Sequence, residues 1–344
     1  MAIGIVKDAI YLEHIADHYH PESPHRLEHI YSMLETLDQS GLDYIRPRMA
    51  AHEEISLNHD LSYIDTIAQT SGKPRVHLDG DTATSPKTYE AACMAVGGVL
   101  ELADAIQSSR VNSGFAFVRP PGHHAEHSKA MGFCVFNNIA VTARYLEKKY
   151  GLKNILIVDF DLHHGNGTQH SFYKDKSVLY FSMHQYPYFP GTGWYEEIGT
   201  GEGTGFTINI PMSYGMGNED YLWALKDVLV PVSEVYMPDI ILVSAGFDTY
   251  YNDPLGGMGV TEAGFAAMSR VLLDLAKKHC GGKLLFVLEG GYDLKGLASS
   301  TRAIILELMG EPAYPYEKKT EPSVAIVQMT AAVKRLLMPY WGHF

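Results

Sequence analysis

The stretch NILIVDFDLHHGNGTQ, residues 154–169, joins a continuous apolar run to a group of ionisable side chains. The continuity of the apolar part suits a strand that is covered on both faces, as in a parallel sheet. Four ionisable side chains then lie within six positions, from Asp159 to His164. Burying such groups without partners costs free energy, so the end of this strand is expected to hold a compensating group, and a metal ion is the first candidate.

Similar apolar runs recur along the chain and alternate with longer stretches typical of helices. The other runs are 113–118, 177–183, 239–246 and 283–290. The expected helices are 86–107, 135–150, 218–236, 261–279 and 295–309. Strands that alternate with helices predict an α/β fold with an open, mostly parallel sheet and helices on both faces.

Polar segments follow each of the five expected strands. They read RPPGHHAEH, DLHHGNG, HQYPYFPGTG, FDTYYNDPLGG and GYD. The carboxyl ends of parallel strands share one edge of a sheet, where ligands bind in the crevice. The five segments are therefore expected to form one active site.

The composition favours a single globular domain over residues 1–344 and excludes some partners. The chain is 46% hydrophobic and carries a formal net charge of -13, which makes nucleic acid an unfavourable partner. An acidic surface attracts cationic partners, although charge for solubility explains it equally simply. Three scattered cysteines, an N-terminus without signal-peptide character and the lack of a membrane-spanning apolar run favour a reducing, cytoplasmic location without a membrane partner.

Asp161 and His163 form a D-x-H pair whose side chains project to the same side of an extended segment. Asp248, after a later strand, supplies a third possible ligand. Two carboxylates and one imidazole suit Zn²⁺ or Fe²⁺, and three protein ligands leave positions open for water and substrate. The alternatives are a chance pair and a dinuclear manganese site. The dinuclear site needs a bridging carboxylate two residues after His163, where the chain has Gly165.

His123 and His124 follow a Pro-Pro pair and are candidates for general acid–base catalysis. Asp159 and Asn166 are available to orient their rings. The alternative is that both histidines are metal ligands or ordinary loop residues. Tyr292, on a glycine-supported turn, is a candidate hydrogen-bond donor to an oxyanion, although it is one of 22 tyrosines.

Together these segments resemble the histone deacetylase and acetylpolyamine amidohydrolase family, which adopts an arginase-like α/β fold with its active site at the carboxyl ends of the strands. The resemblance covers residues 10–310 and keeps the family's order of motifs. It rests on HPESPHRLEHI, RPPGHHA, MGFCVFNNIAVTA, VDFDLHHGNGTQ, FPGTG, VSAGFDTYYNDPLGG and LEGGYDL. The HHGNGTQ form is similar to class II enzymes and to bacterial histone deacetylase-like amidohydrolases.

The resemblance implies a zinc-dependent hydrolysis of amides. In it, Asp161, His163 and Asp248 hold one Zn²⁺ per chain, and Tyr292 polarises the acyl carbonyl together with the metal. It also implies roles for the residues around the acid–base pair. His124 is the general base and then the acid, His123 is its electrostatic partner paired with Asp159, and Asn166 stands beside His124, where many members have aspartate.

The family likeness further implies a substrate channel and a structural potassium site. The residues expected to bind substrate are Gly132, Phe133, Phe189, Leu255 and, at the rim, Asp81. For Phe133 and Phe189, core packing is the alternative. The potassium site is expected to use main-chain oxygens of Asp159, Asp161, His163 and Met183 with the side chain of Ser182.

The expected reaction is removal of an acetyl or other acyl group from lysine side chains in a protein or peptide. The first alternative is the same chemistry on acetylated polyamines, against which stands the absence, near Leu255, of the glutamate that polyamine-selective relatives carry. A catalytically weak acyl-binding module and a dinuclear ureohydrolase are the others. The segment 311–344, with an expected helix over 324–338, is interpreted as packing on the domain or as a contact in a homo-oligomer.

Overall fold

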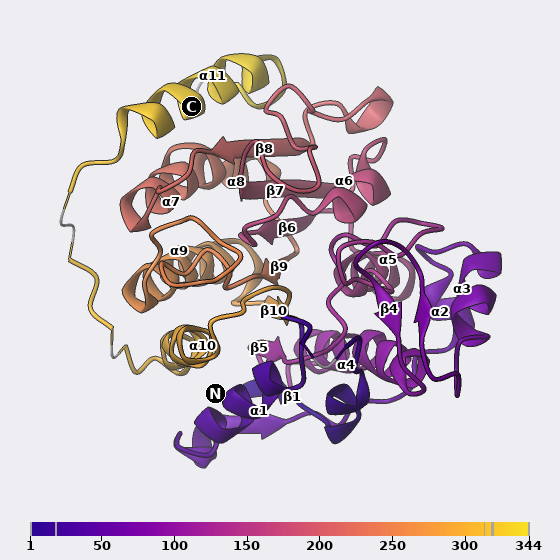
Figure 1. Ribbon diagram of the computed structural model, residues 1–344. Helices are drawn as coiled ribbons and strands as arrows, with labels where there is room; N and C mark the ends of the chain where they lie inside the picture. The colour runs from indigo at the N-terminus through magenta and orange to yellow at the C-terminus, as the bar shows by residue number, and fades with distance from the viewer. Residues whose placement is uncertain (1, 18, 313, 318–319, 343–344) are drawn as a thin grey trace.

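The central element of the computed structural model is a parallel sheet of eight strands in the order β2-β1-β5-β10-β9-β6-β7-β8 (Figure 1). The structure describes residues 2–17, 19–312, 314–317 and 320–342. The strands are β1 Ile3–Val6, β2 Leu42–Tyr44, β5 Ser113–Ala116, β6 Ile155–Asp159, β7 Val178–Gln185, β8 Thr207–Met212, β9 Ile240–Ala245 and β10 Leu284–Leu288. All neighbouring strands in this sheet pair in parallel. A separate antiparallel pair joins β3 Val76–His77 to β4 Ala83–Thr84.

The five strands expected from the sequence are all present, within a few residues of their expected ends. They occupy five consecutive places in the sheet, and nearly all their residues are buried on both faces. The strands of this sheet that the sequence pattern missed are β1, β2 and β8, and it also missed the separate pair β3 and β4. β1 and β2 are very short, and the apolar pattern of β8, TINIPM, is interrupted by Thr207, Asn209 and Pro211.

Helices cover both faces of the sheet (Figure 1). The helices are α1 His25–Leu34, α2 His52–Ile55, α3 Leu61–Ala68, α4 Thr88–Gln107, α5 Asn138–Tyr150, α6 Asn166–Phe172, α7 Asn218–Ala224, α8 Val230–Tyr236, α9 Glu262–Cys280, α10 Leu294–Met309 and α11 Val324–Trp341. α1, α7, α9 and α10 form one layer, and α4 and α5 form part of the other. The expected helix over 218–236 is continuous but widens into a π-helical turn, Leu225–Leu229, between α7 and α8.

The C-terminal helix α11 packs along the outer strand β8 and against α7 (Figure 1). Its side chains Ile326, Val333 and Leu337 are buried in the main core. The indole N–H of Trp341 donates to the Gly205 carbonyl oxygen at 2.8 Å. The last strand of the sheet is therefore covered by the segment that the sequence left open between domain packing and a subunit contact. Among the described residues, no helix combines the length and the apolar character that crossing a bilayer requires.

Candidate active site

The polar segments after five adjacent strands meet at one edge of the sheet. They follow β5, β10, β9, β6 and β7, which are consecutive in the sheet. Together they line a cavity of about 100 Å³, to which each of the five segments contributes at least one residue. The convergence expected from the strand order is present, and it places residues more than a hundred positions apart in one site.

Asp161, His163 and Asp248 lie at the base of this edge with their ligand atoms turned toward one another. One ligand atom from each residue lies within 4.8 Å of the other two. His163 Nδ1 is 3.1 Å from Asp161 Oδ1 and 3.0 Å from Asp248 Oδ2. The two aspartates are 1% and 0% exposed. This is the grouping that the D-x-H pair and Asp248 predict.

Main-chain groups hold the two carboxylates in place. Gly290 N donates to Asp161 Oδ2 at 2.8 Å, and Leu162 N donates to Asp248 Oδ1 at 2.9 Å. Gly290 can approach because it lacks a Cβ, which would lie only 2.4 Å from Asp248 Oδ2 and 2.7 Å from Asp161 Oδ2. The carboxylates are thus oriented by the end of β10 and by the loop after β6.

The electrostatics of the trio favour a positive charge between the two carboxylates. Burial opposes a charge on His163, but its hydrogen bonds to Asp161 and Asp248 outweigh burial and raise the pKa of His163 to about 10. Burial and the charge of Asp161 raise the pKa of Asp248 to about 7. The same field favours a divalent cation, and carboxylate oxygens with an imidazole nitrogen suit Zn²⁺ or Fe²⁺. The residues present therefore fit a catalytic metal ion.

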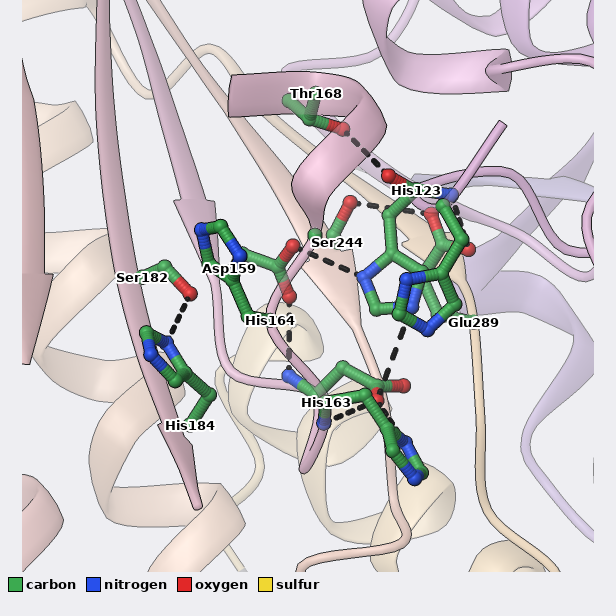
Figure 2. A network of polar contacts seen from close by, with 12 residues as sticks. His123, Asp159, His163, His164, Thr168, Ser182, His184, Ser244 and Glu289 are labelled. Carbon is green, nitrogen blue, oxygen red and sulfur yellow. Dashed lines mark hydrogen bonds and ion pairs between the residues drawn. The ribbon is translucent and has the colours of Figure 1, made fainter. Parts of the chain in front are cut away.

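His123 is paired with Asp159, as the sequence suggests (Figure 2). Its Nδ1 lies 3.1 Å from Asp159 Oδ2, which also accepts from the Tyr180 hydroxyl at 3.0 Å. Burial opposes a charge on His123, but Asp159 and Asp161 outweigh it and raise the pKa of His123 to about 10. Gly165 makes room for this pair, since a Cβ there would lie 2.3 Å from Asp159 Oδ2. Gly165 therefore has two consequences: it supplies no bridging carboxylate, and it leaves the space that the His123–Asp159 pair occupies.

His124 stands beside His123 in a different electrostatic environment. The two ring centroids are 4.0 Å apart, and His124 Nδ1 lies 2.8 Å from Asn166 Oδ1. Asn166 Nδ2 donates to the Glu126 carboxylate, which only accepts, so Asn166 Oδ1 must accept from the Nδ1–H of His124. Burial and the charges of His123 and His163 hold the pKa of His124 well below its usual value. His124 is thus neutral, with Nε2 available as a proton acceptor.

The cavity is lined by all the side chains expected to bind substrate. Gly132, Phe133, Phe189, Leu255 and Asp81 all line it, together with His123, His124, Asp161, His163 and Tyr292. Pro121, Cys134 and Gly290 also line it, and the sequence analysis missed them. Asp159, Asn166 and Asp248 stand behind this lining and act on it through the contacts above.

The walls of the cavity depend on irregular backbone. Gly132 and Phe133 have φ of 54° and 69°, the left-handed region that non-glycine residues rarely adopt. Phe133 N donates to the Thr82 hydroxyl at 3.0 Å, which holds this turn against the loop that carries Asp81. On the other side the Tyr188 hydroxyl donates to the Leu255 carbonyl oxygen at 2.8 Å and ties the Phe189 loop to the Leu255 loop.

Tyr292 lies on a turn that is fixed from two sides. Its N–H donates to Asp253 Oδ2 at 2.6 Å, and the Arg26 guanidinium lies 5.1 Å from the centre of its ring. Arg26 also donates to the carbonyl oxygens of Glu289 and Gly291. Among the described residues, no hydrogen bond holds the Tyr292 hydroxyl, which leaves it free to donate to a ligand in the cavity.

A buried ion cluster supports this turn and was not predicted. Glu22 pairs with both Arg119 and Arg26, and all three side chains are 0% exposed. Burial opposes ionisation of Glu22, but Arg119 outweighs it and holds the pKa of Glu22 well below its usual value. The sequence gives one signal for it, a charged Arg119 directly after the apolar run FAFV.

The residues named for a potassium site lie close together at the ends of β6 and β7. The strand register places Asp159 opposite Ser182, and Met183 is the next residue of β7. The Ser182 hydroxyl lies 2.9 Å from His184 Nδ1, a contact that the sequence analysis did not foresee (Figure 2). The potassium site stays a prediction.

Comparison of the sequence with known proteins indicates the family of this chain. The family model described as "Histone deacetylase domain" matches residues 20–308. The chain is 40% identical over 329 residues to Histone deacetylase 15 of Arabidopsis thaliana, covering 94% of this chain and 59% of that protein. It is 38% identical over 334 residues to Polyamine deacetylase HDAC10 of Homo sapiens, covering 92% of this chain and 49% of that protein. The chain thus spans less than two thirds of the length of these relatives.

The fold agrees as well. The crystal structure of the HDA15 HD domain matches with a TM-score of 0.91 at 38% sequence identity, covering 99% of this chain and 95% of that one. This match confirms the arginase/deacetylase-like fold expected from the sequence. The family model and the relatives together show that the chain belongs to the histone deacetylase family.

Proposed function

We propose that this chain is a zinc-dependent amidohydrolase that removes acetyl or other acyl groups from lysine side chains. The observation that carries the proposal is the position of the Asp161–His163–Asp248 trio. It lies beside one small cavity that His124 and Tyr292 also line. Metal ligands, a neutral base and an unpaired hydroxyl donor around one cavity are the parts that metal-assisted amide hydrolysis requires.

The metal ligands and the acid–base pair have separate tasks. Zn²⁺ bound by Asp161, His163 and Asp248 would polarise the amide carbonyl and acidify an attacking water. His124 Nε2 accepts the proton of that water and then returns it to the leaving amine nitrogen. His123, held in its charged form by Asp159, keeps the proton affinity of His124 low, so that it can release the proton again.

Tyr292 and the channel walls orient the substrate. The Tyr292 hydroxyl donates a hydrogen bond to the carbonyl oxygen as negative charge develops on it. Phe133 and Phe189 line the cavity from two different loops and suit contact with an aliphatic lysine chain, and the exposed Asp81 carboxylate suits main-chain N–H groups of a peptide. A potassium ion at Asp159, Asp161, His163, Ser182 and Met183 would stiffen the loop that carries the ligands.

The substrate class is acyl-lysine in a protein or peptide rather than an acetylated polyamine. The two relatives compared above are named for the two classes, so family membership does not choose between them. Leu255 lines the cavity, and by the resemblance it lies near the point where polyamine-selective relatives carry a glutamate, whereas Asp81 suits a peptide backbone. These two features favour the peptide.

A substrate panel tests this choice. Release of acetate is measured from acetyl-lysine peptides and from acetylated polyamines, with the wild type and with Asp81→Ala. The proposal expects a higher kcat/KM for the peptides and a raised KM for peptides alone in Asp81→Ala. Turnover confined to the polyamines would contradict the substrate class and keep the chemistry.

A further inference from the structure

Glu289 has a buried side-chain carboxylate. It is not one of the three expected metal ligands, and it makes no hydrogen bond to the ring of His123 or His124. It directly follows β10 and is 0% exposed. Its Oε2 accepts from Gly122 N at 2.7 Å and from His123 N at 3.2 Å, and its Oε1 accepts from the Ser244 hydroxyl at 3.1 Å (Figure 2). Burying a carboxylate is costly, so three dedicated donors point to a specific task.

Glu289 lies near two other residues that could bind a metal ion, but it is not a ligand of a second metal site. Ligand atoms of Glu289, His123 and Cys134 lie within 4.8 Å of one another. However, burial raises the pKa of the Cys134 thiol well above its usual value, so Cys134 does not offer the thiolate that a metal ion binds. Both oxygens of Glu289 accept hydrogen bonds instead. Glu289 therefore acts as an acceptor for the main chain.

The segment held by Glu289 has few other ways to satisfy its backbone. Pro120 and Pro121 carry no N–H, and the turn that follows belongs to no helix or strand. Glu289 takes the next two N–H groups, and Thr168 N donates to the His123 carbonyl oxygen at 3.1 Å from the other side. The His123 backbone is thus fixed at both its N–H and its carbonyl group.

We propose that Glu289 is a positioning residue that holds the main chain of the His123–His124 pair by accepting the Gly122 and His123 N–H groups. The proposal rests on the function proposed above. The ring contacts with Asp159 and Asn166 set how each imidazole turns, while Glu289 sets where the backbone that carries both rings lies. A displacement of about 1 Å of a catalytic group costs about 10²-fold in rate.

A matched pair of variants separates the hydrogen bonds from the charge. Glu289→Gln keeps an oxygen at the Oε2 position and removes the charge, and its amide group then donates to the Ser244 hydroxyl. Glu289→Asp keeps the charge but withdraws the oxygens by one methylene. Glu307→Asp is the control, because Glu307 is also buried, at 5% exposure, and pairs with Arg270 on the outer helices.

Two readouts are needed, one of them independent of activity. The first is kcat and KM on an acetyl-lysine peptide. The second is amide hydrogen exchange in a peptide over 117–125, where Gly122 and His123 report the hydrogen bonds directly. The thermal midpoint of each variant shows whether the whole fold has changed.

The expected result is a loss of about 10- to 100-fold in kcat for Glu289→Asp with little change in KM, and faster exchange at Gly122 and His123. In Glu289→Gln, kcat stays within about threefold of the wild type and both amides stay protected from exchange. The same result is expected for the control Glu307→Asp. A Gln variant as impaired as the Asp variant would overturn the proposal, because an oxygen that accepts the two N–H groups would then not be enough to hold the pair. Unchanged amide exchange in Glu289→Asp would overturn it too. If the wild type shows no turnover, the proposed function fails, while the exchange data still decide whether Glu289 holds this segment.

Discussion

At the scale of single residues, the site is built from close approaches that only particular side chains permit. Gly165 and Gly290 let carboxylates lie against the backbone where a Cβ would collide. His123 and His124 are neighbours, yet their pKa values are displaced in opposite directions. Carboxylates outweigh burial at His123 and raise its pKa, whereas burial and the charges of His123 and His163 act together at His124 and lower its pKa. These differences are the basis of the separate roles that we propose for two identical side chains.

Replacing Tyr292 by Phe tests the oxyanion donor. The variant removes the hydroxyl and keeps the ring against Arg26 and Phe133. We expect kcat to fall by about 10²- to 10³-fold with little change in KM, as for other oxyanion donors. Steady-state kinetics on an acetyl-lysine peptide measure this, with bound metal determined in parallel. A loss of less than about threefold would remove Tyr292 from the mechanism.

Replacing Gly165 by Ala tests the fit of the His123–Asp159 pair. The new Cβ would lie 2.3 Å from Asp159 Oδ2 and 3.1 Å from His123 Nδ1, so the pair must move apart. We expect kcat to fall by about 10- to 100-fold. Gly80→Ala is the control, because a Cβ there meets nothing within 4 Å. Equal activity in both variants would show that the spacing of the pair does not matter.

At the scale of elements, the sequence predicted what depends on local pattern. The five buried strands and the convergence of their loops follow from continuous apolar runs that end in polar residues. The missed parts depend on distant partners: Glu22 meets Arg119 across 97 positions, and Glu289 meets Gly122 across 167. The left-handed Phe133 was also unpredictable, because the acceptor of the hydrogen bond that its N–H donates is the Thr82 hydroxyl, which lies 51 positions earlier in the chain.

Glu22 makes the stability of the N-terminal segment depend on pH. Its pKa in the fold lies well below 4.5, so its contribution is complete above 4.5 and is lost as pH falls toward the lowered value. Glu22→Gln leaves Arg26 and Arg119 without their anion, which costs about 3–5 kcal/mol in the free energy of unfolding at neutral pH. Urea unfolding of both proteins across this pH range measures the difference. A difference that stays constant as the pH falls below 4.5 would contradict the assignment.

At the scale of the whole molecule, the eight-stranded sheet has helices on both faces (Figure 1). The residues of the candidate active site lie at the edge formed by the carboxyl ends of its strands. The N-terminal segment and the C-terminal helix pack against this sheet and its loops at separate places. Glu22 and Arg26 brace the turn of Tyr292, and α11 covers the outer strand β8.

The packing of α11 predicts that this helix is part of the folded domain. Leu337 is 0% exposed and belongs to the main core, so Leu337→Ala should cost about 2–5 kcal/mol in the free energy of unfolding. Val324→Ala is the control, because Val324 is 71% exposed and its replacement should cost at most about 0.5 kcal/mol. Denaturant unfolding of both variants checks this. Equal stability would mean that α11 detaches from the domain.

The central claim is that one metal ion at Asp161, His163 and Asp248 makes this chain an amide hydrolase. The most direct measurement is a titration of Zn²⁺, and separately of Fe²⁺, into metal-stripped protein, following acetate release from an acetyl-lysine peptide and the metal bound per chain. We predict no activity in the stripped protein and a linear rise that ends at one Zn²⁺ per chain. Full activity without metal, or a rise that ends only at two ions per chain, would contradict the account.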